Sequence, residues 1–239
     1  MPRKKKHSFR VLKKGISRLS RWTMGVILLP LAWGLSLGLY QVAFSVTQSG
    51  WKTLWIYLVG AGFYFVIEKW VAKPMWLYVF GHESTHVVSG LLTGAKIHSF
   101  KATSKGGEVH LSKSNAFIAL SPYILPFYTA VIILLYALVR HFWTHPYLLP
   151  SFQFLMGATL MFHISMTFSA VHHHQPDLKV LGLFLSGVLI FIGNILILGL
   201  LGVTLFQSAP KMRDYMKTVA KETGYAWVKI IEKGQEWIR

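Results

Sequence analysis

Apolar runs of about twenty residues recur along this chain, and they constrain its fold more than any other feature. A helix of about 20 residues crosses a bilayer core of about 30 Å. Backbone at that depth must be helical, because lipid offers no hydrogen-bond partners. The sequence therefore predicts an all-α polytopic membrane protein with about six transmembrane helices, at residues 23–47, 54–72, 74–95, 115–140, 147–171 and 178–206.

The composition excludes one or two ordinary soluble domains, because 53% of the residues are hydrophobic and only 14% are charged. We divide the chain into a basic cytoplasmic N-terminal segment (1–22), a membrane-embedded core (23–206) and an amphipathic basic tail (207–239). In the tail, apolar residues fall at helical spacing among Lys and Arg, which is typical of an interfacial helix. A partner-docking helix is the alternative for the tail.

Positive charge is concentrated at the ends of the chain, where nine Lys and Arg and no acid occupy the first 21 residues. With six spans, 19 of the 25 Lys and Arg fall on the side of the termini. Cytoplasmic loops carry such an excess, so we expect a multi-pass protein of the cell membrane with both termini in the cytoplasm. Attraction to an anionic lipid bilayer accounts for the net charge of +17, so we expect no nucleic-acid partner.

A His-Glu-x-x-His motif lies inside the third apolar run, at residues 82–86. On a helix, His82 and His86 are one turn apart on the same face and can bind one metal ion. Glu83 is rotated by about 100° and can face a reacting water without being a ligand. This short motif also occurs by chance, but charged groups in hydrocarbon are costly and normally functional. We therefore predict a metal site.

A catalytic zinc usually has three protein ligands, and the chain contains no cysteine, so the third must be a His or a carboxylate. Of the eight acids, four lie in the polar tail and Glu68 ends the second run. Glu83 is already assigned within the motif. Glu108 and Asp177 remain, and Glu108 fits poorly because it lies in a strand-like segment.

Asp177 lies in a polar break between two apolar runs, after His172, His173, His174, Gln175 and Pro176. Proline interrupts a helix, and irregular backbone at membrane depth is tolerated where it is buried in protein or lines a wet cavity. Asp177 can thus be presented to the metal from this break. It can also cap the helix that follows, and one of His172, His173 and His174 can replace it as ligand.

Two further features lie between the motif and this break. Residues 96–101 and 108–112 are extended runs around Gly-Gly, which predicts a short β-hairpin. Its edge can pair with an unwound substrate, or the segment can be a plain loop.

Pro122 and Pro126 predict a kink in the fourth run.

An embedded His-Glu-x-x-His followed by a hairpin, further spans and a Pro-Asp pair resembles the site-2 protease family of intramembrane zinc metallopeptidases. The resemblance covers roughly residues 74–200. It implies a Zn2+ ion held by His82, His86 and Asp177, with Glu83 as general base. It also implies an integral membrane protein as substrate, unwound at the scissile bond.

This sequence departs from the family pattern, because Leu178 stands where a glycine usually follows the aspartate and His172–His174 stand near the usual asparagine. We therefore expect a divergent member. The family's hairpin faces the cytosol, whereas the charge distribution puts residues 96–114 and Asp177 on the outer side.

Two other classes of function are compatible with the sequence. A membrane adaptor or scaffold would carry the motif without hydrolysing anything. A metal or proton transporter would spread polar residues through several spans, but the other spans carry few.

Overall fold

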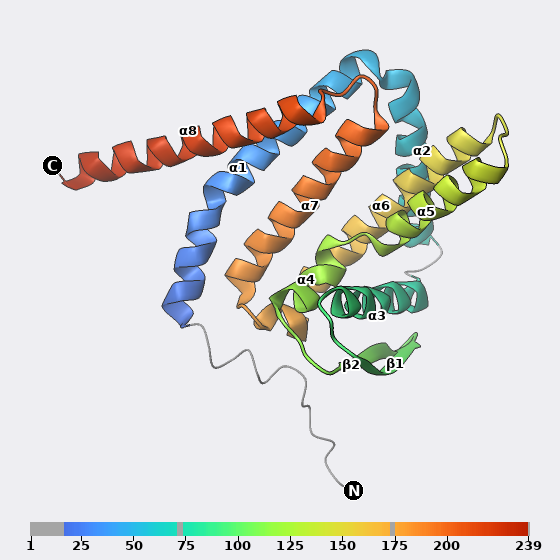
Figure 1. Cartoon of the computed structure of the whole chain (residues 1–239), viewed down its shortest axis with the longest axis horizontal. Helices are drawn as coiled ribbons and strands as arrows, with labels where there is room; N and C mark the ends of the chain where they lie inside the picture. The colour runs from blue at the N-terminus through green and yellow to red at the C-terminus, as the bar shows by residue number, and fades with distance from the viewer. Residues whose placement is uncertain (1–16, 71–73, 173–174, 239) are drawn as a thin grey trace, which may run out of the picture. The chain divides into compact units, whose positions relative to one another are not determined.

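The computed structural model describes residues 17–70, 74–172 and 175–238, and most of these lie in helices (Figure 1). In chain order the helices are α1 (Arg18–Ser49), α2 (Trp51–Trp70), α3 (Met75–Leu92), α4 (Ala116–Ile124), α5 (Phe127–Phe142), α6 (Leu148–His172), the 3-10 helix η2 (Pro176–Lys179), α7 (Leu183–Leu205) and α8 (Met212–Ile238). Two strands, β1 (Ile97–Thr103) and β2 (Gly106–Leu111), lie between α3 and α4. The structure confirms that the fold is mainly helical with one small hairpin.

Three helices, α1, α6 and α7, are long and apolar enough to cross a membrane. The predicted number of six spans is not confirmed within the described part of the chain. α2 carries Lys52, Glu68 and Lys69 near its ends, and α3 is 18 residues long and includes His82, Glu83 and His86. Neither α2 nor α3 meets the same test of length and hydropathy.

The fourth predicted run is broken, as its prolines indicate. α4 and α5 together pass the same test of length and hydropathy, but they meet at an angle of 71°. The break falls at Leu125 and Pro126, because the proline ring cannot continue the helix and favours an extended conformation in the residue before it. The pair forms a broken span or a re-entrant loop.

The described part of the chain divides into two compact units, and the first comprises the described residues between 55 and 186 together with Ser17. Within it, α2 packs on α6 through two glycines. A Cβ atom on Gly60 would overlap the carbonyl oxygen of Phe154, and one on Gly157 would overlap that of Tyr57. The two helix backbones are therefore in direct contact, as small residues allow between membrane helices.

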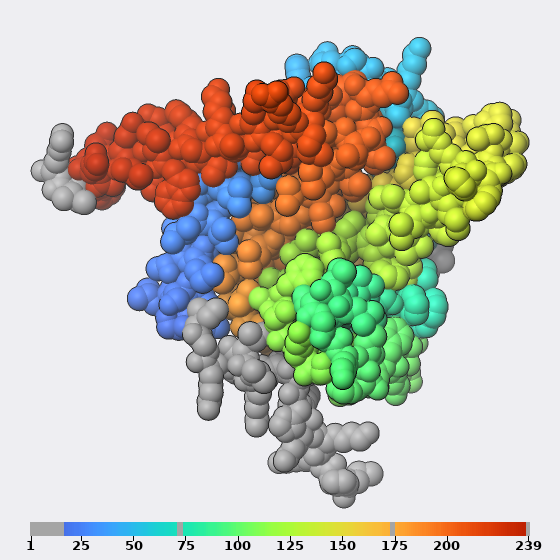
Figure 2. Space-filling model, viewed as in Figure 1, coloured from blue at the N-terminus to red at the C-terminus, as the bar shows by residue number. Residues whose placement is uncertain are grey.

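The hairpin lies along α3 (Figure 1). β1 and β2 pair antiparallel, with Lys101 opposite Glu108, which confirms the predicted hairpin. A Cβ on Gly90 would lie 2.9 Å from Leu111, and one on Gly107 would lie 2.5 Å from Glu83. The strands are largely exposed, so the hairpin forms part of the surface of this unit (Figure 2).

The second unit comprises residues 18–54 and 187–239. Its core is a cluster of buried apolar residues from α1 and α8: Leu35, Val42, Val46, Tyr215 and Val219. Gly34 and Gly38 of α1 face α8, since a Cβ on Gly38 would lie 2.8 Å from Val219. The tail thus forms the predicted helix, and its place at the membrane interface remains a prediction.

The contact between α2 and α6 predicts a sharp difference between two glycines of α2. Gly60→Ala places a methyl group against the backbone of Phe154 and should lower the free energy of unfolding by about 1–3 kcal/mol. Gly62→Ala is the matched control, because nothing lies within 4 Å of a Cβ there. Thermal unfolding of both variants in detergent measures the difference, and equal midpoints would contradict the observed packing.

Candidate metal centre

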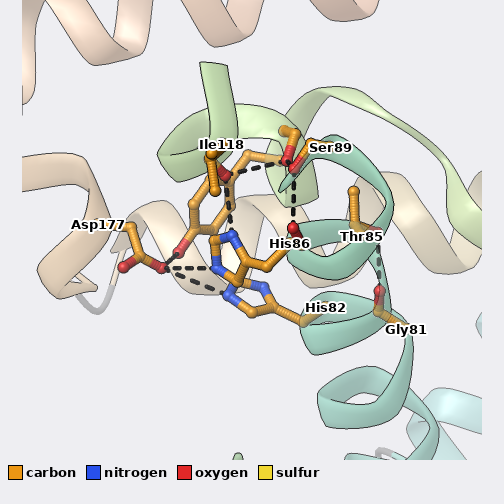
Figure 3. A network of polar contacts seen from close by, with 9 residues as sticks. Gly81, His82, Thr85, His86, Ser89, Ile118 and Asp177 are labelled. Atoms are coloured by element: carbon orange, nitrogen blue, oxygen red, sulfur yellow. Dashed lines mark hydrogen bonds and ion pairs between the residues drawn. The ribbon is translucent and has the colours of Figure 1, made fainter. Parts of the chain in front are cut away.

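α3 carries the two histidines of the motif on one face. The ring centroids of His82 and His86 are 4.9 Å apart, one helical turn along α3. Both side chains point toward the carboxylate of Asp177, which comes from η2 (Figure 3). One nitrogen from each ring and one carboxylate oxygen lie within 4.8 Å of one another, so the three residues form a group that could hold a metal ion.

The spacing of the donor atoms fits a single ion. Oδ2 of Asp177 lies 3.4 Å from Nε2 of His82 and 3.6 Å from Nε2 of His86. Tetrahedral zinc with bonds of about 2.0–2.1 Å separates its ligand atoms by about 3.3–3.4 Å. Each of the three side chains is only 10–12% exposed, and together they would leave a fourth position for water or substrate.

The break between α6 and α7 positions Asp177. Pro176 opens η2, and Leu178 is only 2% exposed, which anchors the short helix in the protein. The hydroxyl of Ser186 donates to the carbonyl of Leu178 at 2.8 Å. Gly182, at a φ of 85°, then turns the chain into α7. The alternative role of Asp177 as cap of the sixth helix is wrong, because that helix begins at Leu183.

A hydrogen bond from the other side of its ring orients His86. Nδ1 of His86 lies 2.8 Å from the carbonyl oxygen of Ile118 in α4. A proton on Nδ1 donates to that oxygen and leaves the lone pair of Nε2 for a metal, which is the usual arrangement of a metal-binding histidine. Asn115 in turn caps α4 by accepting from the backbone N–H of Ile118 at 2.8 Å.

His82 has an unsatisfied nitrogen at the edge of the group. Its Nδ1 is buried and has no hydrogen-bond partner among the described residues. A cavity of about 30 Å³ lies beside the ring, with Tyr78, Thr85 and His163 in its wall. This volume has room for a water molecule, which would accept the Nδ1 proton when Nε2 binds a metal.

Tyr123 supports the carboxylate of the group, and the sequence analysis did not find this role. Its side chain is 1% exposed, and its hydroxyl donates to Oδ2 of Asp177 at 3.1 Å. Its ring lies 5.2 Å from that of His82. The only signal in the sequence was a tyrosine beside Pro122 in an apolar run, which indicated a kink rather than a contact across 54 residues.

Glu83 is buried next to the three residues but is not one of them. It interacts electrostatically with His86 and Asp177. The backbone of Gly107, at the start of β2, lies against it, and a Cβ there would come within 2.7 Å of Oε1. Only a glycine therefore allows the hairpin to cover the Glu83 side chain so closely.

The structure does not bring the other candidate ligands into this group. Glu108 lies on the exposed strand β2, with Oε1 3.0 Å from Nε2 of His110. His172 is an exposed residue at the end of α6 and is not part of the group. His173 and His174 lie outside the described residues.

Comparisons with models of protein families, with curated proteins and with solved structures found no match.

The geometry predicts which variants lose metal. His82→Ala, His86→Ala and Asp177→Ala each remove one of three ligands and should abolish stoichiometric binding by the purified protein. Glu108→Ala is the carboxylate control and should bind as the wild type does, because Glu108 lies outside the group. Elemental analysis after dialysis measures the metal content. Wild-type content in all three ligand variants would rule out this site.

Loss of the Tyr123 hydroxyl should weaken metal binding without abolishing it. Residues that orient a ligand typically contribute about 10- to 100-fold to metal affinity, so we expect a loss of this size in Tyr123→Phe. Tyr128→Phe is the control, because that hydroxyl donates to the backbone oxygen of Leu77. Competition with a chelator measures both affinities, and equal values would show that Tyr123 does not support Asp177.

Proposed function

We propose that the protein is an intramembrane zinc metalloprotease, a divergent member of the site-2 protease family. The observation that carries the proposal is the meeting of His82, His86 and Asp177 around one position, with Glu83 buried beside them. Residues 95 positions apart in the chain contribute to this arrangement. A His-Glu-x-x-His motif present by chance would not require a buried carboxylate to face both of its histidines.

Zinc is the metal that suits these residues best. Two imidazole nitrogens and one carboxylate oxygen, without sulfur, are a common donor set of catalytic zinc. Magnesium and calcium prefer oxygen ligands in sites of higher coordination number. The separations of 3.4 and 3.6 Å between donor atoms support four-coordinate geometry.

Zinc bound here would act as a Lewis acid that polarises the scissile carbonyl and the attacking water. Glu83, which is buried beside the three residues, would accept the proton that this water loses as its oxygen bonds to the carbonyl carbon. When the C–N bond breaks, Glu83 returns the proton to the leaving amine. The products are a carboxylic acid and an amine, and Glu83 ends in its initial state.

The hairpin supports a peptide substrate. A helix hides its carbonyl groups in hydrogen bonds, so a membrane segment must unwind before it is cut. The sheet has two strands in the described part of the chain, and an extended peptide can pair with an outer edge. Because Gly107 lies against Glu83, a peptide held by the hairpin would be close to the proposed base.

The proposed location follows from the apolar helices. Three helices able to cross a bilayer support a reaction in or near a membrane, with an integral membrane protein as the substrate. Cytoplasmic termini in the cell membrane remain part of the proposal, on the basis of the charge distribution.

Glu83→Gln tests the chemistry separately from the metal. The variant keeps the size of the side chain but cannot accept a proton, and Glu83 is not a ligand, so zinc should be retained. Loss of a general base should lower the rate by about 10²–10⁴-fold. The assay needs a membrane-spanning substrate with a Gly or Pro that weakens its helix, reconstituted with the purified protein.

Three results of the Glu83→Gln experiment would contradict part of the proposal. Equal cleavage by Glu83→Gln and wild type would contradict the protease proposal. Loss of zinc from this variant would give Glu83 a structural role. Absence of cleavage by the wild type, with metal bound, would favour the adaptor or the transporter.

A further inference from the structure

A peptide hydrolase must stabilise negative charge on the carbonyl oxygen of its substrate. Hydrogen-bond donors aimed at that oxygen typically contribute about 10²–10³-fold to kcat. Such a donor must be buried near the reacting atoms and must be uncommitted to another partner. The described residues around the metal centre can be sorted by this criterion.

Most hydroxyl groups around the metal centre already donate to a protein oxygen. Thr85 donates to the carbonyl of Gly81, and Tyr128 donates to that of Leu77. The hydroxyl of Ser121 lies within hydrogen-bond distance of two acceptors, the hydroxyl of Ser89 and the backbone carbonyl of Ile118 in α4, for its one proton. Tyr123 donates to Asp177. Each of these hydroxyls is held in place by a bond within the protein.

Tyr78 is different. It lies one turn before His82 in α3, and the two ring centroids are 5.5 Å apart. Its hydroxyl is buried and has no hydrogen-bond partner in the part of the chain that the structure describes. Burying a hydroxyl without a partner is costly, so the Tyr78 hydroxyl is available to donate to a water or to a substrate that enters the site.

Tyr78 is a neighbour of the metal-binding group. It lines the cavity that also borders His82, and it interacts electrostatically with the carboxylates of Asp177 and Glu83. Tyr78, His82 and His86 follow one another at intervals of four residues in α3, so they lie along one face of the helix. A carbonyl oxygen bound at the metal would therefore lie on the same face of α3 as Tyr78.

We propose that the Tyr78 hydroxyl donates a hydrogen bond to the oxygen of the scissile carbonyl and is a catalytic residue. The inference rests on the proposed hydrolytic function. As the water oxygen bonds to the carbonyl carbon, the π electrons move to the carbonyl oxygen, and Tyr78 stabilises that charge while keeping its own proton. When the C–N bond breaks, the electrons return and the hydrogen bond weakens.

Tyr78→Phe removes only the hydroxyl oxygen. We expect kcat to fall by about 10²–10³-fold with little change in KM, since the bond strengthens mainly in the transition state. Zinc content should stay at the wild-type value. Tyr215→Phe is the matched control, because it removes another buried hydroxyl without a partner, from the second unit. It should leave kcat unchanged.

Binding gives a readout that does not depend on turnover. A phosphinic peptide carries a charged tetrahedral oxygen in place of the scissile carbonyl. Tyr78→Phe should bind this probe about 10- to 100-fold more weakly, as expected for loss of a hydrogen bond to a charged group. Tyr78→Phe and wild type, both carrying Glu83→Gln, should bind the uncleaved substrate equally.

The two proposals fail in different ways. If Glu83→Gln is inactive but Tyr78→Phe keeps the kcat and the phosphinate affinity of the wild type, the inference about Tyr78 is overturned and the protease proposal stands. If Glu83→Gln cleaves like the wild type, both are overturned. If Tyr78→Phe loses zinc or unfolds, 3-fluorotyrosine at this position keeps the shape and makes the hydroxyl more acidic, and an unchanged kcat then overturns the inference.

Discussion

One carboxylate connects the parts of the site, because Oδ2 of Asp177 faces the Nε2 atoms of both His82 and His86 and accepts from Tyr123. A buried carboxylate is costly unless charge or hydrogen bonds compensate it. The short helix η2, the buried side chain of Leu178 and the turn at Gly182 together hold the Asp177 carboxylate in this position. The break between α6 and α7 is thus the means by which a distant segment reaches α3.

A second set of contacts holds the histidines, and it runs through backbone groups. The carbonyl of Ile118 faces His86, and Asn115 fixes the start of α4. These contacts depend on α4 ending soon afterwards, at the bend of 71° toward α5. A continuous helix over residues 115–140 would not have this short, separately oriented first half. The prolines of this run therefore shape the site as well as the fold.

The sequence could predict features that depend on residues close together in the chain, but not those that depend on contacts between distant residues. The His-Glu-x-x-His spacing defines a helical face locally, and Pro176 marks the break, so His82, His86 and Asp177 were found together. The hairpin and the kink also follow from local residues. Tyr123 and Ile118 were missed because their roles depend on contacts between helices, which apolar patterning does not encode. The number of spans was predicted from hydrophobic length alone, which does not distinguish a helix within the protein from one that crosses lipid.

The connection between the hairpin and α4 has a mechanical consequence. Only residues 112–115 separate the end of β2 from the helix whose carbonyl orients His86. The same hairpin rests on Glu83 through Gly107. A displacement of the strands would therefore move both the proposed base, Glu83, and one metal ligand, His86. Binding of a peptide to the hairpin would then align both residues at the same time.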